Sequence, residues 1–328
     1  MSSRKDNALV ALNELRNQQN SRNASVRAHF DHQRKHSDNP DSATQHAWFH
    51  GMKNVLQEVD EALGCIPSFS PLHYLDVGCC PGGFSSYILS KNVRSTGVGI
   101  SLAVEGGGHD LLLEENLRPR LDLNIADLTY YQLGLTIIAD PRLKPLPFPP
   151  DSRPFDLVLL DGHPLRTSAS KGIAHANTAS RLLVSQLILC LQATAISGTI
   201  IMKLAKPERP VTAKLLYMFD MLAIDLASWK PVCMHATRDT FYVVAKGFGY
   251  GRQGYRLREW LDRLKVLWMS LTYDELRSSD GISAADLDFV ATEMELKAFE
   301  YRHLQLSKHI WQVQTSSLEG WKRVEGLE

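Results

Sequence analysis

The sequence lacks an excess of either charge. Lysines and arginines number 36 among the 328 residues, aspartates and glutamates also number 36, and the isoelectric point lies near 7.2. A strongly basic chain would indicate nucleic-acid binding through its overall field, and this chain gives no such indication. Its 44% hydrophobic and 22% charged residues are typical of a globular protein with a sizeable buried core.

Cysteines are also few. The chain has five, an odd number, scattered and without a C-x-x-C pair: Cys65, Cys79, Cys80, Cys190 and Cys233. Disulfide-stapled extracellular domains have dense, paired cysteines, and zinc sites need closely spaced ligands. The cysteines therefore indicate a reducing compartment and predict no metal site.

Residues 1–30 lack the apolar core of a secretory signal peptide. We expect an intracellular protein of the cytoplasm or nucleus, with the mitochondrion as an alternative because arginines recur in this stretch. The charge-free run 182–202 has the length of a membrane span, but Gln186 interrupts it and Gly198 separates a helix-like half from a strand-like half. We interpret it as a buried helix followed by a central strand and expect no membrane partner.

Apolar patterns typical of strands and helices alternate through the middle of the chain. Expected strands are 74–77, 96–100, 121–125, 155–160, 199–204 and 241–245. Expected helices are 47–63, 85–91, 111–116, 179–193 and 213–226. This alternation predicts an α/β fold with a mostly parallel, doubly wound sheet.

The two ends of the chain do not continue the alternation. Residues 1–44 are polar, with weak helical spacing over 6–17, and we expect a partly mobile arm. Beyond residue 254, apolar residues at 257–271 follow helical spacing, and a second helix is expected to begin at Ser283, with a capping box to Asp286, and to continue past Met294. The predicted organisation is an arm (1–44), a central domain (45–250) and a helical extension (251–328).

The centre of the domain is the stretch D-V-G-C-C-P-G-G-F at residues 76–84, where a strand leads through a glycine-rich turn into a helix. Gly78 lets a ligand approach the backbone, Pro81 suits the first turn of a helix, and Gly82 and Gly83 leave amides open. Neither G-x-G-x-x-G nor a Gly-Lys-Ser/Thr loop is present, so a dinucleotide fingerprint and a P-loop both fit poorly. The remaining alternative to a ligand site is an ordinary tight turn.

Three residues with chemical potential follow strands of the predicted sheet. Gly78, Asp161 and Lys203 stand at or near strand ends. Because the carboxyl ends of parallel strands share one edge, where such folds bind their ligands, these residues are expected to form one site. A cation among the apolar residues around 203 also needs a partner, so a structural salt bridge is the alternative for Lys203, and a turn former is the alternative for Asp161.

Residues 76–84 resemble motif I of the FtsJ/RrmJ-type ribosomal RNA methyltransferases, D-x-G-x-x-P-G-G-[FW]. Further similar segments are 47–49, 155–164, 198–204 and 230–244. The resemblance covers about residues 45–248. It implies a Rossmann-like class I methyltransferase fold with a seven-stranded, mostly parallel doubly wound sheet, here with helical N- and C-terminal extensions, and S-adenosyl-L-methionine as cofactor.

The resemblance also implies a Lys-Asp-Lys-Glu tetrad that transfers a methyl group to an RNA ribose 2′-hydroxyl. That hydroxyl is a weak nucleophile, so a buried lysine held by carboxylates takes its proton. Asp161 and Lys203 match the tetrad, with Lys203 as base and Asp161 as its partner. His50 stands where the first lysine is expected, with Lys53 one turn away, and Thr240 stands where the glutamate is expected, beside Asp239.

The residues that the resemblance implies for cofactor binding lie in motif I and at later strand ends. They are Asp76, Gly78, Cys80, Pro81, Gly82, Gly83, Phe84, Ser101, Asp127 and Asp161. Ser101 replaces an expected acid, with Glu105 as an alternative, and residues 106–110 resemble the G-x-G-H-E loop of viral RNA cap methyltransferases. For Asp127 the alternative is a surface acid, and for His50 it is a helix-surface histidine.

The leading prediction is an S-adenosylmethionine-dependent methyltransferase that acts on RNA. Two alternatives stay open: a methyltransferase for a small-molecule acceptor, and an FtsJ-like RNA-associated binding protein that has lost catalysis. The basic, histidine-rich stretch 22–36 either contacts phosphates or is a solvated tail. The sequence does not determine the oligomeric state.

Overall fold

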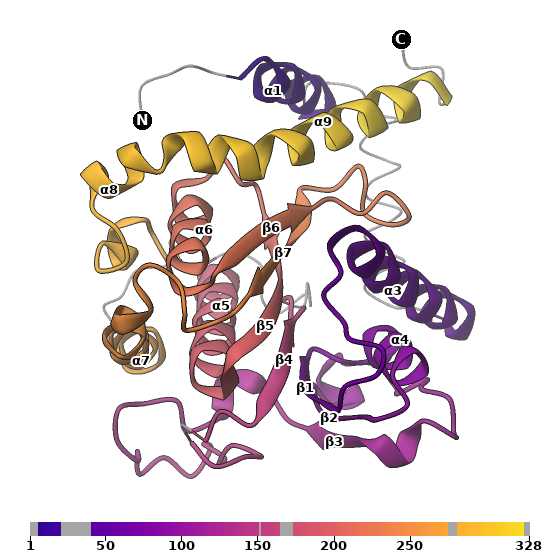
Figure 1. The fold of residues 1–328 in the computed structure, drawn as a ribbon, viewed down its shortest axis with the longest axis vertical. Coiled ribbons are helices and arrows are strands. Elements are labelled where there is room, and N and C mark those ends of the chain that lie inside the picture. Colours follow the sequence, from indigo (N-terminus) through magenta and orange to yellow (C-terminus); the bar gives the residue numbers. More distant parts are fainter. Residues whose placement is uncertain (1–5, 21–40, 151, 165–172, 275–280, 325–328) are drawn as a thin grey trace.

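The computed structural model describes residues 6–20, 41–150, 152–164, 173–274 and 281–324. The stretch 22–36, expected above either to contact phosphates or to be a solvated tail, lies outside these residues. A central sheet has seven strands in the order β3-β2-β1-β4-β5-β7-β6, with helices on both faces (Figure 1). This arrangement confirms the predicted α/β fold with a doubly wound sheet.

The first five strands are parallel, and β7 runs antiparallel between β5 and β6. Their bounds are β1 Leu72–Val77, β2 Ser95–Ser101, β3 Leu121–Ile125, β4 Phe155–Leu160, β5 Thr194–Ala205, β6 Asp225–Trp229 and β7 Thr240–Lys246. The chain winds outward from β1 to β3 and then returns to β4 on the other side of β1. The strand order therefore reverses between β1 and β4, which is where doubly wound sheets bind ligands.

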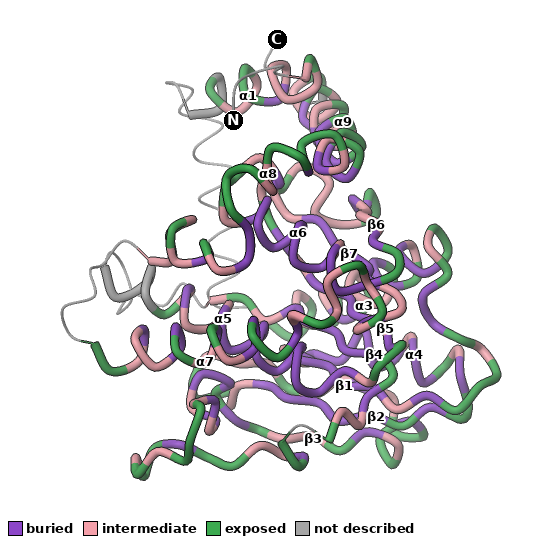
Figure 2. The backbone as a smooth tube through the Cα atoms, turned by 60° about the vertical axis from the view of Figure 1, so that its left-hand side comes forward, coloured by how far each residue is buried: buried purple, intermediate pink, exposed green. Residues whose placement is uncertain are grey.

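Helices cover the two faces of the sheet unequally. Helices α3 (Ser42–Leu63) and α4 (Gly83–Lys91) pack on one face, whereas α5 (Ile173–Ala193) and α6 (Pro210–Leu222) pack on the other, and α7 (Leu257–Tyr273) packs against α5 (Figure 1). The central strands are buried on both sides, as Figure 2 shows, which explains their continuous apolar sequences. Among the described residues no helix combines the length and apolarity that crossing a bilayer requires.

The two ends of the chain lie side by side. Helix α9 (Glu300–Val324), which follows the short α8 (Glu293–Ala298), passes along β6, and α1 (Asn7–Asn20) packs on α9 (Figure 1). Leu12 of α1 is fully buried against Trp311 and Leu318 of α9. The helical spacing noted over residues 6–17 therefore belongs to a helix with a packed face.

Two helix predictions were wrong because tertiary contacts decide these segments. Residues 111–116 form an extended segment that ends in a turn, held by the Leu112 amide donating to the Pro81 carbonyl at 2.9 Å and by the burial of Leu113. The capping box of Ser283 and Asp286 does form, but it opens only a 3-10 turn at Ala285–Leu287. The helix begins at Glu293, with its own box between Thr292 and Glu295.

The segment between β5 and β7 also differs from its prediction. The helix expected over 213–226 ends at Leu222, and β6, which the prediction missed, follows at once. Leu222 and Leu226 have helical spacing, but pairing with β7 takes Leu226 into the sheet. The helix–strand break assigned to Gly198 lies instead between Ala193 and Thr194, and Gly198 belongs to an irregular part of β5.

Candidate active site

The turn after β1 brings two backbone segments into contact. Gly78 has a φ of +80°, and its amide donates to the Ile100 carbonyl of β2 at 2.8 Å. A Cβ at this position would lie 2.9 Å from the Cα of Gly162, in the turn after β4. Only glycine combines this backbone conformation with this closeness, so Gly78 sets the distance between the two strand ends.

The start of α4 is equally close-packed. A Cβ at Gly83 would lie 2.4 Å from the Phe49 carbonyl oxygen of α3, so the two helices meet backbone to backbone. Phe84 is buried and its ring lies 6.0 Å from that of Tyr242 on β7. Pro81 precedes the N-cap residue Gly82, so the prediction that it occupies the first turn of the helix was wrong.

Asp76 has an unused hydrogen-bonding atom. Its side chain is buried, Ser85 Oγ donates to Oδ2 at 2.7 Å, and Oδ1 has no partner among the described residues. Burial, with a contribution from the nearby Asp161, raises the pKa of Asp76 to about 7. Buried acceptors are nearly always satisfied, so this oxygen fits a ligand that carries a hydrogen-bond donor. The amino group of S-adenosylmethionine is such a donor.

Ser101 and Asp127, both predicted to contact the cofactor, lie at the carboxyl ends of β2 and β3. Ser101 is buried, and hydrogen bonds from Cys79 and Ser101 lower the pKa of the Cys80 thiol. The Asp127 carboxylate accepts hydrogen bonds from the amide (2.9 Å) and the hydroxyl (2.8 Å) of Thr129. Asp127 is thereby the N-cap residue of a short 3-10 turn. The structure therefore gives Asp127 a capping role, and its contact with a cofactor stays a prediction.

Lys203 and Asp161 form an ion pair. Alternation along the strands places both side chains, like that of Asp76, on the sheet face under α3 and α4. Lys203 Nζ lies 2.7 Å from Asp161 Oδ1, and its side chain is only 14% exposed. The hydroxyl of Tyr242, directly opposite Lys203 in the register of β5 and β7, donates to the same Oδ1 at 3.1 Å. One carboxylate thus holds both neighbours.

Gln186 on α5 positions the turn that carries Asp161. Its side-chain oxygen accepts from the Gly162 amide at 3.0 Å, and its side-chain nitrogen donates to the Gly162 carbonyl at 3.1 Å. The side chain is almost fully buried. From the sequence, Gln186 was interpreted only as an interruption of an apolar run, although a buried amide in such a run needs partners and was the available signal.

The other two tetrad positions do not join the ion pair. Among the described residues, no hydrogen bond or ion pair links His50 or the Thr240 hydroxyl to Lys203 or Asp161. His50 is exposed on α3, and the Thr240 carbonyl accepts a hydrogen bond from Lys230. Of the neighbours considered as substitutes, Lys53 is paired with Glu114 at 3.0 Å, and Asp239 is paired with Arg16 and Lys206.

Two histidines that were not predicted as site residues approach the pair. His163 is exposed and its Nδ1 lies 3.5 Å from the Asp161 carbonyl; the chain packed around the ring and the charge of Lys203 lower the pKa of His163. Burial and the same charge lower the pKa of His235 to about 3. Both rings are therefore neutral at pH 7, and they add no positive charge beside Lys203.

A seven-stranded sheet of this order, parallel except for β7, is the fold of the Rossmann-like class I methyltransferases. The family model for FtsJ-like methyltransferases matches residues 55–248. That span is more than half of the chain, and the protein belongs to the FtsJ-like methyltransferase family. S-adenosylmethionine is accordingly its cofactor, and the Asp76 cradle fits it.

Solved structures give distant matches. A protein described as a ribosomal RNA methyltransferase from Plasmodium falciparum is 18% identical, with a TM-score of 0.41 over 61% of this chain and 97% of its own. A protein described as an rRNA methylase from Clostridium thermocellum is 11% identical, with a TM-score of 0.38 over 58% of this chain and 96% of its own. A TehB-like SAM-dependent methyltransferase from Corynebacterium glutamicum is 13% identical, with a TM-score of 0.34 over 60% and 88%. These scores are too low to support an argument about substrate, and no curated protein matches the chain.

Proposed function

We propose that the protein transfers a methyl group from S-adenosylmethionine to a ribose 2′-hydroxyl of RNA. The observation that supports the proposal best is the Lys203–Asp161 ion pair, 2.7 Å long, on the same sheet face as the unsatisfied Asp76 oxygen. Asp161 and Lys203 match the two central members of the family's tetrad. The ribose acceptor comes from this match, since the net charge of the chain gives no support for RNA.

In this proposal Lys203 first releases a proton to solvent, and its neutral amine then accepts the proton that the hydroxyl loses as its oxygen attacks. The bound cofactor supplies an electrophilic methyl group. Asp161 stabilises the ammonium form of Lys203 after the proton has moved, and Tyr242 holds the carboxylate in place from the other side. Gln186 fixes the turn that carries Asp161, so the geometry exists before the acceptor binds.

The altered tetrad positions define the competing outcomes. His50 and Thr240 replace a lysine and a glutamate, and within the described part of the chain no hydrogen bond or ion pair joins either side chain to Lys203 or Asp161. A small-molecule methyltransferase would bind the cofactor but leave RNA unmodified. A binding protein that has lost catalysis would methylate no acceptor.

The test is a calorimetric titration with S-adenosylmethionine, followed by transfer of a labelled methyl group to total cellular RNA. We expect saturable binding, and transfer that falls by about 10²–10⁴-fold in Lys203→Ala and Asp161→Ala. Lys214→Ala is the matched control, because Lys214 is also a buried lysine paired with an aspartate, Asp288, but lies on α6 away from the site. Transfer that survives in Lys203→Ala would refute the proposed base.

A further inference from the structure

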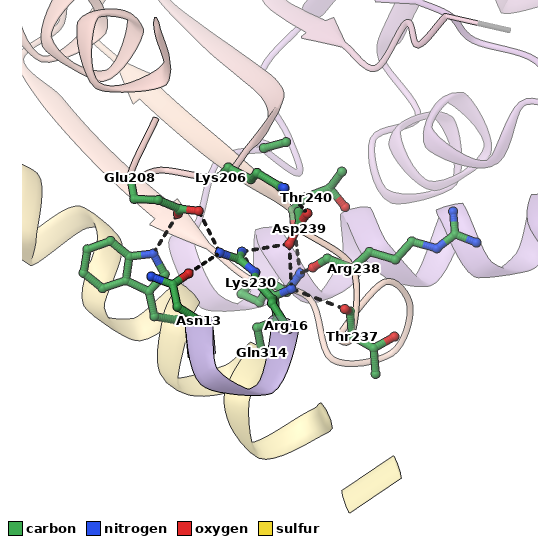
Figure 3. A network of polar contacts seen from close by, with 12 residues as sticks. Asn13, Arg16, Lys206, Glu208, Lys230, Thr237, Arg238, Asp239, Thr240 and Gln314 are labelled. Carbon is green, nitrogen blue, oxygen red and sulfur yellow. Dashed lines mark hydrogen bonds and ion pairs between the residues drawn. The ribbon is translucent and has the colours of Figure 1, made fainter. Parts of the chain in front are cut away.

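Arg16, on the N-terminal helix α1, reaches into the catalytic domain. Its Nη1 lies 2.7 Å from Glu208 Oε1, and its Nη2 lies 2.7 Å from Asp239 Oδ1 (Figure 3). The side chain is only 14% exposed. Arg16 lies outside the family-matched region 55–248, but both of its acidic partners lie inside it.

The two partners belong to segments that border the ion pair. Glu208 lies in the turn between β5 and α6, five residues after Lys203, and Asp239 immediately precedes β7, three residues before Tyr242. Lys206 joins these segments directly. Its amide donates to the Asp239 carbonyl at 3.1 Å, and its Nζ lies 3.1 Å from Asp239 Oδ2. Arg16 therefore bridges the segments that continue the two strands carrying Lys203 and Tyr242.

Helix α9 adds neutral contacts to the same carboxylates. Gln314 Nε2 donates to Asp239 Oδ1 at 2.9 Å and to the Thr237 carbonyl at 3.3 Å (Figure 3). Trp311 Nε1 donates to Glu208 Oε2 at 3.1 Å. Since α1 and α9 pack on each other, helices from both ends of the chain together hold Glu208 and Asp239.

The loop before β7 is also held from inside. Lys230 is fully buried, and its Nζ donates to the carbonyls of His235 (2.9 Å), Thr240 (2.6 Å) and Arg238. The loop 235–240 is thus fixed by a buried lysine on one side and by Arg16 with Gln314 on the other (Figure 3). His235, whose pKa is lowered by burial and by the charge of Lys203, belongs to this loop. The loop leads directly into β7, where Tyr242 lies opposite Lys203 in the strand register, so it borders the end of the sheet that carries the base.

We propose that Arg16 is a positioning residue of the acceptor site: it fixes the β5–α6 turn and the loop 235–240 so that the RNA meets a preformed edge beside Lys203. The inference rests on the proposed function and assigns the N-terminal helix to acceptor positioning. The cofactor turn at 78–83 belongs to β1 and α4, and β4 separates it from β5 in the sheet. Arg16 should therefore affect the acceptor and leave cofactor binding alone.

The test compares full-length Arg16→Gln and Arg16→Lys with the wild type. For Arg16→Gln we expect faster hydrogen exchange in 235–240, a kcat for RNA methylation at least about tenfold lower, and unchanged S-adenosylmethionine affinity by calorimetry. Arg16→Lys should restore part of the kcat, because a lysine keeps the charge but loses the fork that holds two carboxylates.

Arg302→Gln is the matched control. Arg302, on α9, also pairs with an aspartate (Asp220, 2.9 Å) and donates to a carbonyl (Leu226), but on α6 and β6 away from the loop. It should lower the melting temperature without changing exchange in 235–240 or the kcat. The proposal is overturned if Arg16→Gln keeps its loop protection and kcat, or if both variants lose kcat only in proportion to stability.

Failure of the proposed function is distinguishable from failure of this inference. If the wild type methylates no RNA, the proposed function fails. Hydrogen exchange then still decides the role of Arg16. Faster exchange confined to 235–240 supports it, whereas unchanged exchange there, or an equal rise at 78–83, overturns it.

Discussion

The part of the site that we propose for the cofactor (the cofactor half) and the part that we propose for the acceptor (the acceptor half) are built by different means. The cofactor half, residues 76–84 with Ser101, is shaped by backbone packing, since Gly78 and Gly83 allow contacts that a Cβ would prevent. The acceptor half, the end of β5 and the start of β7 with the loop 235–240, is shaped by ion pairs and hydrogen bonds from distant parts of the chain. The first half can be recognised from a local motif, whereas the second is visible only in the side-chain contacts between segments far apart in the chain.

The largest effect should come from breaking the cofactor half at Gly78. In Gly78→Val the side chain would meet the Gly162 backbone at less than 3 Å and strain a φ of +80°. We expect a loss of at least about 2–4 kcal/mol in the free energy of unfolding and no detectable S-adenosylmethionine binding. Chemical denaturation and calorimetry measure the two effects. Gly320→Val is the control, because a Cβ there meets nothing within 4 Å. Normal cofactor binding by Gly78→Val would show that close contact between the turn at Gly78 and the turn at Gly162 is not needed for cofactor binding.

The second prediction is that Asp76, in the cofactor half, makes the stability of the protein depend on pH. Because burial raises the pKa of Asp76 above its unfolded value, to about 7, the folded protein binds an extra proton between about pH 4 and 7. The resulting stabilisation is complete below about pH 4 and is lost as the pH rises towards 7 and beyond. Asp76→Asn should remove this loss, so thermal unfolding of the two proteins should diverge with rising pH. Parallel profiles would contradict the assignment to Asp76.

The same group should couple cofactor binding to protons. A donor bound at Asp76 Oδ1 stabilises the charged carboxylate, so binding near pH 6.5–7 should release a proton. Calorimetry in two buffers of different ionisation enthalpy measures this release. Asp76→Asn should show none, and a wild type without proton release would mean that Asp76 is not the ligand's partner.

Gln186 links the two halves and should show an intermediate effect. Gln186→Leu leaves the half-buried amide and carbonyl of Gly162 without their partners, which costs about 1–3 kcal/mol and loosens the turn that carries Asp161. Methylation should fall more than cofactor affinity does. Gln192→Leu is the matched control, because Gln192 is a buried glutamine on the same helix. It should leave the ratio of methylation rate to cofactor affinity unchanged.

The smallest effect should come from Tyr242→Phe. This change removes one hydrogen bond to Asp161 but keeps the ring that packs on Phe84. We expect a change of about 1 kcal/mol in stability and a several-fold lower kcat, measured by thermal unfolding and steady-state kinetics. An unchanged kcat would show that Lys203 alone is enough to orient the carboxylate.

Elements whose structure depends on nearby residues could be predicted from the sequence, whereas elements decided by distant contacts could not. The strands and the helices at 47–63, 85–91 and 257–271 were confirmed, because their apolar spacing matches the faces they bury. Asp161 and Lys203 were correctly brought together by the rule that parallel strands end at one edge. Residues 111–116 and β6 were missed, since a hydrogen bond to Pro81 and pairing with β7 decide them. No local pattern indicates that Arg16 meets Asp239, 223 positions away.

The most direct test of the central claim is the position of the methyl group on RNA. Wild type, Lys203→Ala and Lys214→Ala are incubated with labelled S-adenosylmethionine and RNA, and the product is cleaved with alkali, which requires a free 2′-hydroxyl. We predict that the wild type and Lys214→Ala leave the label in alkali-resistant dinucleotides, and that Lys203→Ala leaves almost none. Label only in alkali-released mononucleotides, or equal labelling by Lys203→Ala, would contradict the account.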